Sequence, residues 1–407
     1  MNEIVNIFKS RPFLAVSLSS LLLLVCCYHF VYRLGLNLSI LVGISAITLF
    51  ISLSKEMLAF FKESLENKRK NLIVLCILFF SGLGLVLNFE NIKEIGFFVI
   101  LFFSFYLIFR NENRILNNFI FNLVIFSGIL MSLGVFIGIF ESIFLSSELF
   151  HHVYDGYAYF GEKSVYSGFG FNHNYSAYII IIAQSFLFLS TSIFNRKLKL
   201  FLTLFFLAAL LISAAKIAFL FLDLLAINFF SKQIGKKKFL IFGLISFYLF
   251  LTHIVIAISN GYEIGSDHYQ ELLFSFLGVD FILGFYGYSK ELYFISLYEN
   301  LFLPISLEDI RQALNYDPHF LFYSFIILGG FPLCLSILAF LTHGIYKNII
   351  IIEKRIHVYF YCGLLAIISE SFLWDAYDSP FFWIIIIYAI TFSKDHLITK
   401  EGSRAIT

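Results

Sequence analysis

The stretch "PFLAVSLSSLLLLVCCYHFVY" (residues 12–32) contains no aspartate, glutamate, lysine or arginine. As an α-helix it would rise roughly 30 Å, which matches the thickness of the hydrocarbon core of a bilayer. We therefore expect a membrane-spanning helix here. The run is too long for the apolar core of a signal peptide and shows no convincing small-residue cleavage site, so we expect this first span to be retained.

Apolar runs of similar length recur along the whole chain. The 407 residues are 60% hydrophobic and 20% aromatic, with only 14% charged side chains, and the mean hydropathy is +0.88. A soluble protein of this size needs a larger polar surface, so that class is excluded. We predict an all-α polytopic membrane protein, a single integral membrane domain over residues 1–407 with about 12 transmembrane helices. The predicted spans lie near 12–32, 36–53, 72–89, 95–109, 119–140, 175–194, 200–215, 217–230, 239–258, 320–342, 358–373 and 381–393.

Lysine and arginine are distributed unevenly between the segments that join these spans. All but six of the 28 basic residues fall in the N-terminus, the C-terminus and five connections. Because positively charged connections stay in the cytoplasm, this asymmetry predicts that both termini are cytoplasmic. The five basic connections are 54–71, 110–118, 195–199, 231–238 and 343–357, and the six exceptions are Arg33, Lys93, Lys163, Lys216, Lys290 and Arg311.

Two long segments, 141–174 and 259–319, then face outward. The second is rich in acidic residues and has apolar patches, which favours amphipathic helices lying on the membrane. Residues 200–230 are apolar but have basic clusters on both sides, which favours two short spans meeting near 212–219. Among the cytoplasmic connections, 54–71 is the longest and has the pattern of an amphipathic surface segment.

Neither the cysteines nor the histidines predict a metal site. The five cysteines lie inside apolar runs without metal-ligand spacing, and we interpret them as small residues of membrane helices. His151, His152, Asp155 and His173 could be combined on paper, but their spacing matches no established ligand pattern. The sequence also has no Walker-type phosphate loop. We therefore expect no metal, no cofactor and no nucleic-acid partner.

The strongest single candidate for chemistry is His319, in "NYDPHFLFYSFIILGGFPL" (315–333). Asp317 suits a helix N-cap and Pro318 the first helical position, which puts His319 in the first turn of a span. The positive end of the helix dipole disfavours an imidazolium, so His319 would be neutral and able to accept a proton. The alternative is an interfacial histidine that hydrogen-bonds to a loop. Further along, the pair Gly329–Gly330 would let another helix approach closely.

Lys216 is the second candidate, at the tip of the hairpin near 212–219. A cation there could bind a phosphate or pyrophosphate headgroup, and Asp223, two helical turns further on, could orient it. A lysine that snorkels to the membrane interface is the alternative. His268 and Arg311 are further basic groups on the outer side, with the alternative that both are surface residues of amphipathic helices.

A third part of the predicted site is "SGFGFNHNYSAYIIII" (167–182), at the end of the first outward segment. Asn174 suits the N-cap of the span that follows, which would leave backbone N–H groups pointing outward. Those groups, together with Asn172 and His173, could contact an anionic headgroup or a glycan. The alternative is a helix cap without a binding role.

The order of these features resembles the O-antigen polymerase and O-antigen ligase superfamily of bacterial envelope glycosyltransferases, over roughly residues 160–335. The family has a Gly/Asn-rich stretch before a span, like "SGFGFNHNYSAY", and then a hairpin whose turn carries Ser-Arg, where this chain has "ISAAKIAF". Its large periplasmic loop begins with an Arg-bearing helix and a Gly-x-Gly segment, which "SDHYQELLFSFLGVDFILGFYGYS" (266–289) resembles. A Pro-His-Asn then opens a span with Gly-x-x-Gly further on, where this chain has "PHFLFYSFIILGG".

The resemblance implies a role for each matching position. His319 falls on the key histidine of the family and Lys216 on its first functional arginine, while His268 lies close to the second. Because both arginines are replaced, Arg311 becomes a candidate for the second arginine's role. Phe320 stands where the family has asparagine.

The activity implied by the resemblance is metal-independent, inverting glycosyl transfer at the periplasmic face of the bacterial inner membrane. The donor would be a glycan on undecaprenyl pyrophosphate. The replaced arginines and the aromatic-rich loops favour an O-antigen polymerase, whose acceptor is another lipid-linked repeat unit. An O-antigen ligase, which uses the lipid A core, is the alternative, and a lipid-linked oligosaccharide flippase is the alternative from another class. The expected partners are the lipid-linked glycan, membrane lipids and a chain-length regulator protein.

Overall fold

The structure, a computed structural model of the chain, describes most of the predicted helical segments. The described residues are 7–27, 31, 35–66, 71–111, 113–145, 152–154, 163–170, 172–189, 194–213, 215, 217–218, 221–222, 224–226, 301–314, 321–349, 358–373 and 378–391.

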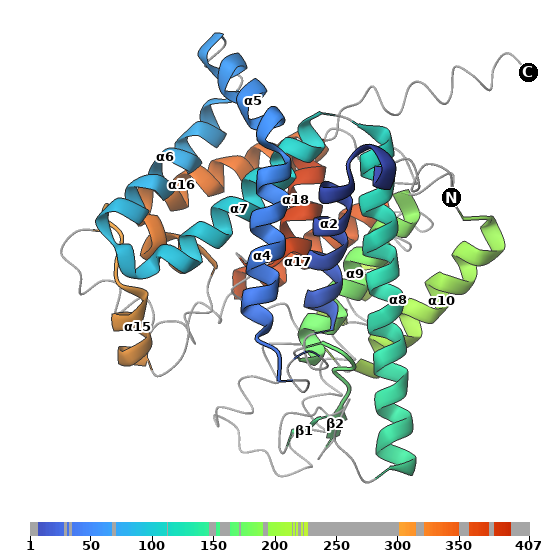
Figure 1. Cartoon of the computed structure of the whole chain (residues 1–407). Helices are drawn as coiled ribbons and strands as arrows, with labels where there is room; N and C mark the ends of the chain where they lie inside the picture. The colour runs from blue at the N-terminus through green and yellow to red at the C-terminus, as the bar shows by residue number, and fades with distance from the viewer. Residues whose placement is uncertain are drawn as a thin grey trace, which may run out of the picture.

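The described residues form a bundle of α-helices with one small β-hairpin (Figure 1). The strands β1 (His152–Tyr154) and β2 (Lys163–Val165) pair antiparallel, with Val153 opposite Ser164. The sequence did not predict this hairpin. The helices are α2 (Pro12–Cys26), α4 (Leu38–Ser52), α5 (Ser54–Glu66), α6 (Leu72–Leu87), the 3-10 helix η1 (Phe89–Asn91), α7 (Ile92–Arg110), α8 (Arg114–Phe144), α9 (His173–Leu189), α10 (Arg196–Ser213), α15 (Leu307–Leu314), α16 (Leu321–Ile349), α17 (Val358–Leu373) and α18 (Pro380–Thr391).

Helices occupy ten of the predicted spans, because each uninterrupted apolar run satisfies its backbone hydrogen bonds internally as a helix. Three helical stretches are long and apolar enough to cross a membrane, and α4 with α5 makes a fourth if this bent pair counts as one span. The chain is therefore a helical protein with three or four candidate membrane spans among the described residues. A total of about 12 spans stays a prediction. The three stretches are Phe89–Arg110, Arg114–Phe144 and Leu321–His343; the predicted spans 217–230 and 239–258 lie largely and wholly outside the described residues.

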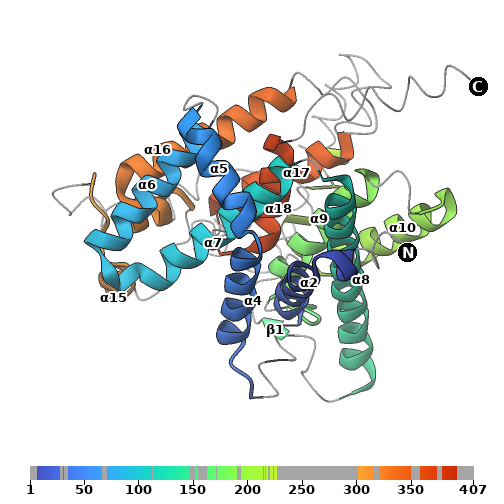
Figure 2. The ribbon, with the colours of Figure 1, turned by 45° about the horizontal axis from the view of Figure 1, so that its top comes forward.

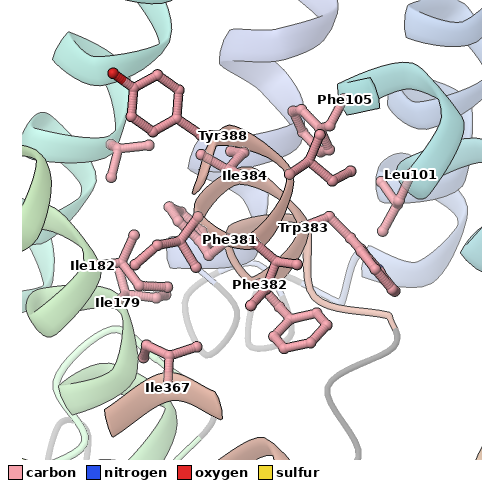
Figure 3. Close-up of a cluster of buried hydrophobic side chains, with 14 of the residues drawn as sticks. Leu101, Phe105, Ile179, Ile182, Ile367, Phe381, Phe382, Trp383, Ile384 and Tyr388 are labelled. Atoms are coloured by element: carbon pink, nitrogen blue, oxygen red, sulfur yellow. The ribbon is translucent and has the colours of Figure 1, made fainter. Parts of the chain in front are cut away.

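The centre of the bundle is α18. Every residue of this helix from Pro380 to Ile390 is buried, and Figure 3 shows its side chains spread among those of α7, α9 and α17. The Trp383 ring lies 5.4 Å from the Phe98 ring and 5.2 Å from the Phe102 ring, between centroids. A helix that is apolar on all sides and covered on all sides is a core helix, so α18 faces protein along its length.

The two ends of the bundle differ in character. At one end, which we call the basic end, lies α5, with Arg11 and Arg110 beside it (Figure 1). At the other, the hairpin end, lie β1, β2 and α15 (Figures 1 and 2). A glutamate of α5 pairs with Arg11 and another with Arg110, which ties these segments together. Which end faces the cytoplasm stays a prediction.

Candidate functional site

Four of the eight predicted site residues lie outside the described residues. These are His319, Lys216, His268 and Asp223, so their predicted roles stay predictions. The structure does show that α10 ends at Ser213, inside the stretch 212–219 where the sequence predicts a break between two spans. Ala215 and Ile217, on either side of Lys216, are both fully buried.

The glycine turn, residues 167–170, packs directly against the backbone of α8. Gly168 has a φ of +58°, and a Cβ on it would lie 2.6 Å from the carbonyl carbon of Gly134. Conversely, a Cβ on Gly134 would lie 2.7 Å from the backbone nitrogen of Phe169. Glycine is required at both positions, because the two backbones touch and one of them is in the left-handed region. The turn is therefore held rigidly at the hairpin end.

The N-cap of α9 is Asn172, and the prediction that Asn174 is the cap was wrong. The Oδ1 atom of Asn172 accepts a hydrogen bond from the backbone N–H of Tyr175 at 2.7 Å. A capping side chain must precede the first helical residue and reach the third, and only Asn172 does so, because α9 begins at His173. The hydroxyl of Ser176 lies 2.5 Å from the Ser167 carbonyl oxygen and closes the turn from the other side.

This arrangement changes what the turn offers to a ligand. Asn172 is 8% exposed and its side-chain oxygen is used by the cap, so its predicted contact with a glycan is disfavoured. Asn174 is half-buried, and its Oδ1 has no hydrogen-bond partner among the described residues. His173, beside it, is also half-buried. The Oδ1 of Asn174 is itself buried, so the contact of Asn174 with a substrate stays a prediction.

A second folded element lies at the hairpin end and consists of residues 301–306, which we call the strap. Helix α16 is broken at Gly329 and Gly330, the latter with a φ of +74°, and the strap runs beside the break. The N–H of Ile305 donates to the carbonyl of Ile327 at 2.8 Å, and the N–H of Phe331 donates to the carbonyl of Leu301 at 2.7 Å. The strap thus supplies partners to backbone groups around the break.

The prediction of a close helix approach at Gly329–Gly330 is confirmed. A Cβ on Gly84 of α6 would lie 2.4 Å from the carbonyl oxygen of Leu328 and 3.3 Å from the Cα of Gly329. Helices α6 and α16 are therefore in backbone contact, which small residues allow in membrane helices. The break itself was not predicted.

Asn91 anchors the strap, and sequence reasoning missed it. Its Nδ2 donates to the carbonyl of Ile305 at 2.7 Å, and its Oδ1 accepts from the N–H of Leu307 at 3.0 Å. Asn91 is 1% exposed. Next to it, the hydroxyl of Ser306 donates to Glu90 at 2.7 Å. The available signal was the polar stretch "NFEN" (88–91) between two apolar runs.

Arg311 of α15 is held between two carboxylates. Its Nη1 lies 3.6 Å from Glu94 Oε1 and 3.9 Å from Glu308 Oε2. Two negative charges beside one guanidinium repel an approaching anion. The geometry therefore favours a role for Arg311 in fixing α15 to α7 over the predicted role in pyrophosphate binding.

Glu141 near the C-terminal end of α8 is a charged residue that the sequence reasoning also passed over. It is 1% exposed, although the flanking residues Phe140 and Ile143 are largely exposed. One residue further, the hydroxyls of Ser142 and Tyr166 lie 3.1 Å apart, which brings the chain before the glycine turn onto α8.

Possible metal ligands and one cavity can be described for the part of the chain that the structure covers. Among the described residues, no group of three or more His, Cys, Asp and Glu side chains could hold a metal ion. A cavity of about 180 Å³ lies at the basic end, lined in part by Arg11, Glu56 and Asn113. It is smaller than usual ligand pockets, which span about 300–1,000 Å³.

Comparisons of the chain with family models, with curated proteins and with solved structures gave no match. The assignment of the candidate site therefore rests on the residues of this chain.

Proposed function

We propose that the chain is an O-antigen polymerase, which joins a glycan carried on undecaprenyl pyrophosphate to another lipid-linked repeat unit at the periplasmic face of the inner membrane. The pattern of motifs described above is the main support. The structural observation that adds most is the strap with α15, because this folded segment ends five residues before His319 and is fixed at the end of the bundle opposite the basic one.

In the proposed reaction the hydroxyl oxygen of the acceptor sugar attacks the anomeric carbon of the donor. The bond from that carbon to the pyrophosphate oxygen breaks, and undecaprenyl pyrophosphate leaves with the electron pair. His319 accepts the hydroxyl proton as general base. Attack from the side opposite the leaving group inverts the configuration of the anomeric carbon.

The departing pyrophosphate needs a positive charge near it. Lys216 is the best candidate, because Arg311 is already engaged by Glu94 and Glu308. His268 would add a second charge when protonated. A contact between Asn174, at the start of α9, and a sugar hydroxyl would require its buried Oδ1 to become accessible when the substrate binds. No nucleotide is required, since the donor is already activated.

The test is complementation of a deletion strain, read as the ladder of lipopolysaccharide chain lengths on a gel. We expect His319→Ala to abolish the ladder and leave one repeat unit on the core, while the wild-type gene restores it. The matched control is His343→Ala, because His343 is exposed on α16 and lies more than twenty residues after His319 in the sequence. A normal ladder with His319→Ala would refute the proposal.

The gel and a translocation assay on the same deletion strain together distinguish the alternatives. A deletion strain that carries no repeat unit on any core would indicate the ligase. A flippase would be indicated if lipid-linked repeat units stayed on the cytoplasmic side in the deletion strain and were translocated again by a variant lacking both His319 and Lys216.

A further inference from the structure

Helix α5 has two faces of opposite character, and the structure fixes which of them is turned to the protein. It follows α4 after the single residue Leu53, with a bend of 56° between the two helices. At 100° per residue, Glu56 and Glu63 share one side of the helix with the buried residues, and three large apolar residues share the other. The protein-facing side holds Glu56, Phe60, Glu63 and Ser64, and the outward side holds Leu58, Phe61 and Leu65.

Ion pairs hold the protein-facing side in place. Arg11 Nη1 lies 2.5 Å from Glu56 Oε1, and Arg110 pairs with Glu63 two turns further along. The guanidinium carbon of Arg110 also lies 5.1 Å from the centre of the Phe60 ring, and Phe60 is 1% exposed. Two ion pairs seven residues apart prevent rotation of α5 about its axis.

Hydrogen bonds fix the C-terminal part of α5 in the same orientation. The Nδ2 of Asn71 donates to the hydroxyl of Ser64 at 2.8 Å, and the hydroxyl of Tyr106 donates to the Oδ1 of Asn71 at 3.4 Å. All three residues are buried in this contact. The outward side of α5 is therefore exposed because of how the helix is anchored.

The outward side forms an apolar stripe, which is 73% exposed at Leu58 and 78% exposed at Leu65. Before the bend, α4 also carries a row of exposed isoleucines. On α4 this row consists of Ile40, Ile44, Ile47 and Ile51. An exposed apolar row on a helix of a membrane protein faces lipid acyl chains, and α5 carries its own apolar stripe beyond the bend.

The charges of α5 indicate which part of the lipid it meets. Two of its three glutamates are neutralised by arginines on the protein-facing side. Lys55 and Lys62, also seven residues apart, are exposed along one edge of the apolar stripe, with Glu66 at the end of the same edge. The outward side therefore combines an apolar stripe with a net positive charge, which suits the boundary between acyl chains and anionic headgroups.

We propose that α5 is a membrane-surface helix that binds anionic phospholipid in the leaflet at the basic end. Leu58, Phe61 and Leu65 insert among the acyl chains, and Lys55 and Lys62 contact lipid phosphates. The two arginine–glutamate pairs transmit this anchoring to α2 and α7. This surface is independent of the proposed enzymatic function.

The test is site-specific fluorescence of the full-length protein in vesicles. An environment-sensitive label is placed at Leu58→Cys or Leu65→Cys, with the five native cysteines replaced. Ala59→Cys is the matched control, because Ala59 is exposed but lies away from the apolar stripe. Vesicles of phosphatidylcholine with and without phosphatidylglycerol carry brominated acyl chains as quenchers, and iodide serves as the quencher in water.

We expect brominated lipid to quench the labels at positions 58 and 65, and iodide to quench the label at 59. Replacing Lys55 and Lys62 by glutamine should weaken the preference for vesicles with phosphatidylglycerol, by about fivefold per lysine. Iodide quenching at 58 and 65 as strong as at 59 would overturn the proposal. Protection from both quenchers would also overturn it, since this would indicate a protein partner or a second copy. A photocrosslinking residue at position 58 of the unaltered chain gives a second measurement, in which phospholipid must be the crosslinked species.

Discussion

Replacement of Gly330 by alanine tests the connection between the strap and the break in α16. Gly330 has a φ of +74° and a ψ of 175°, a region that is nearly exclusive to glycine and costs other residues about 1–3 kcal/mol. A Cβ there would lie 2.4 Å from the carbonyl oxygen of Phe302 and 2.7 Å from its carbonyl carbon. The clash is with backbone, so the strap must move away from α16.

Moving the strap breaks the hydrogen bonds Ile305 to Ile327 and Phe331 to Leu301, which contribute about 1 kcal/mol each. The lost hydrogen bonds and the backbone strain at position 330 add up. The free energy needed to undock the strap therefore falls by about 3–5 kcal/mol in the variant. We therefore expect amide hydrogen exchange at Ile305 and Phe331 to rise a hundredfold or more.

Hydrogen exchange by mass spectrometry on the protein in detergent measures this change. The matched control is Gly82→Ala, because Gly82 lies inside α6 with open space around its Cα and gains helix propensity. Unchanged exchange at Ile305 and Phe331 in Gly330→Ala, with the control also unchanged, would show that the strap is not held by the break.

Three further substitutions test the other contacts. Gly84→Ala should lower the thermal unfolding midpoint of the detergent-solubilised protein by several degrees, because overpacking against the Leu328 carbonyl costs about 1–3 kcal/mol; a higher midpoint would contradict the contact. Asn91→Ala leaves two buried backbone groups without partners, at about 1–3 kcal/mol each, so limited proteolysis should cleave near the strap faster, and an unchanged rate would argue against the anchor. Asn172→Ala should destabilise α9 by about 1 kcal/mol in the same unfolding measurement, whereas Asn174→Ala should not; the reverse order would restore Asn174 as the cap.

The positions of the helices could be predicted from the sequence because a long apolar run has few alternatives in a membrane. The role of α18 could not, since an apolar helix looks the same in sequence whether it faces lipid or other helices. Its central position depends on the rings of α7 and the aliphatic side chains of α9 and α17 packing around it.

The details of the candidate site depended on contacts between distant segments. Asn91 and Ile305 are 214 positions apart, so nothing local to either residue predicts their hydrogen bond. The cap of α9 was predicted two residues too late because Asn172 and Asn174 have the same capping chemistry. The start of α9 at His173 decides between them, because only Asn172 then precedes the helix.

The most direct test of the proposed polymerase is reconstitution of the purified protein in vesicles with the lipid-linked repeat unit extracted from the deletion strain. The reaction contains a chelator and no nucleotide. For a polymerase we expect chains of several repeat units on one lipid and the release of one undecaprenyl pyrophosphate for each bond formed. Both products should be lost with His319→Ala. Repeat units that remain single in the presence of active wild-type protein, or chains that still form with His319→Ala, would contradict it.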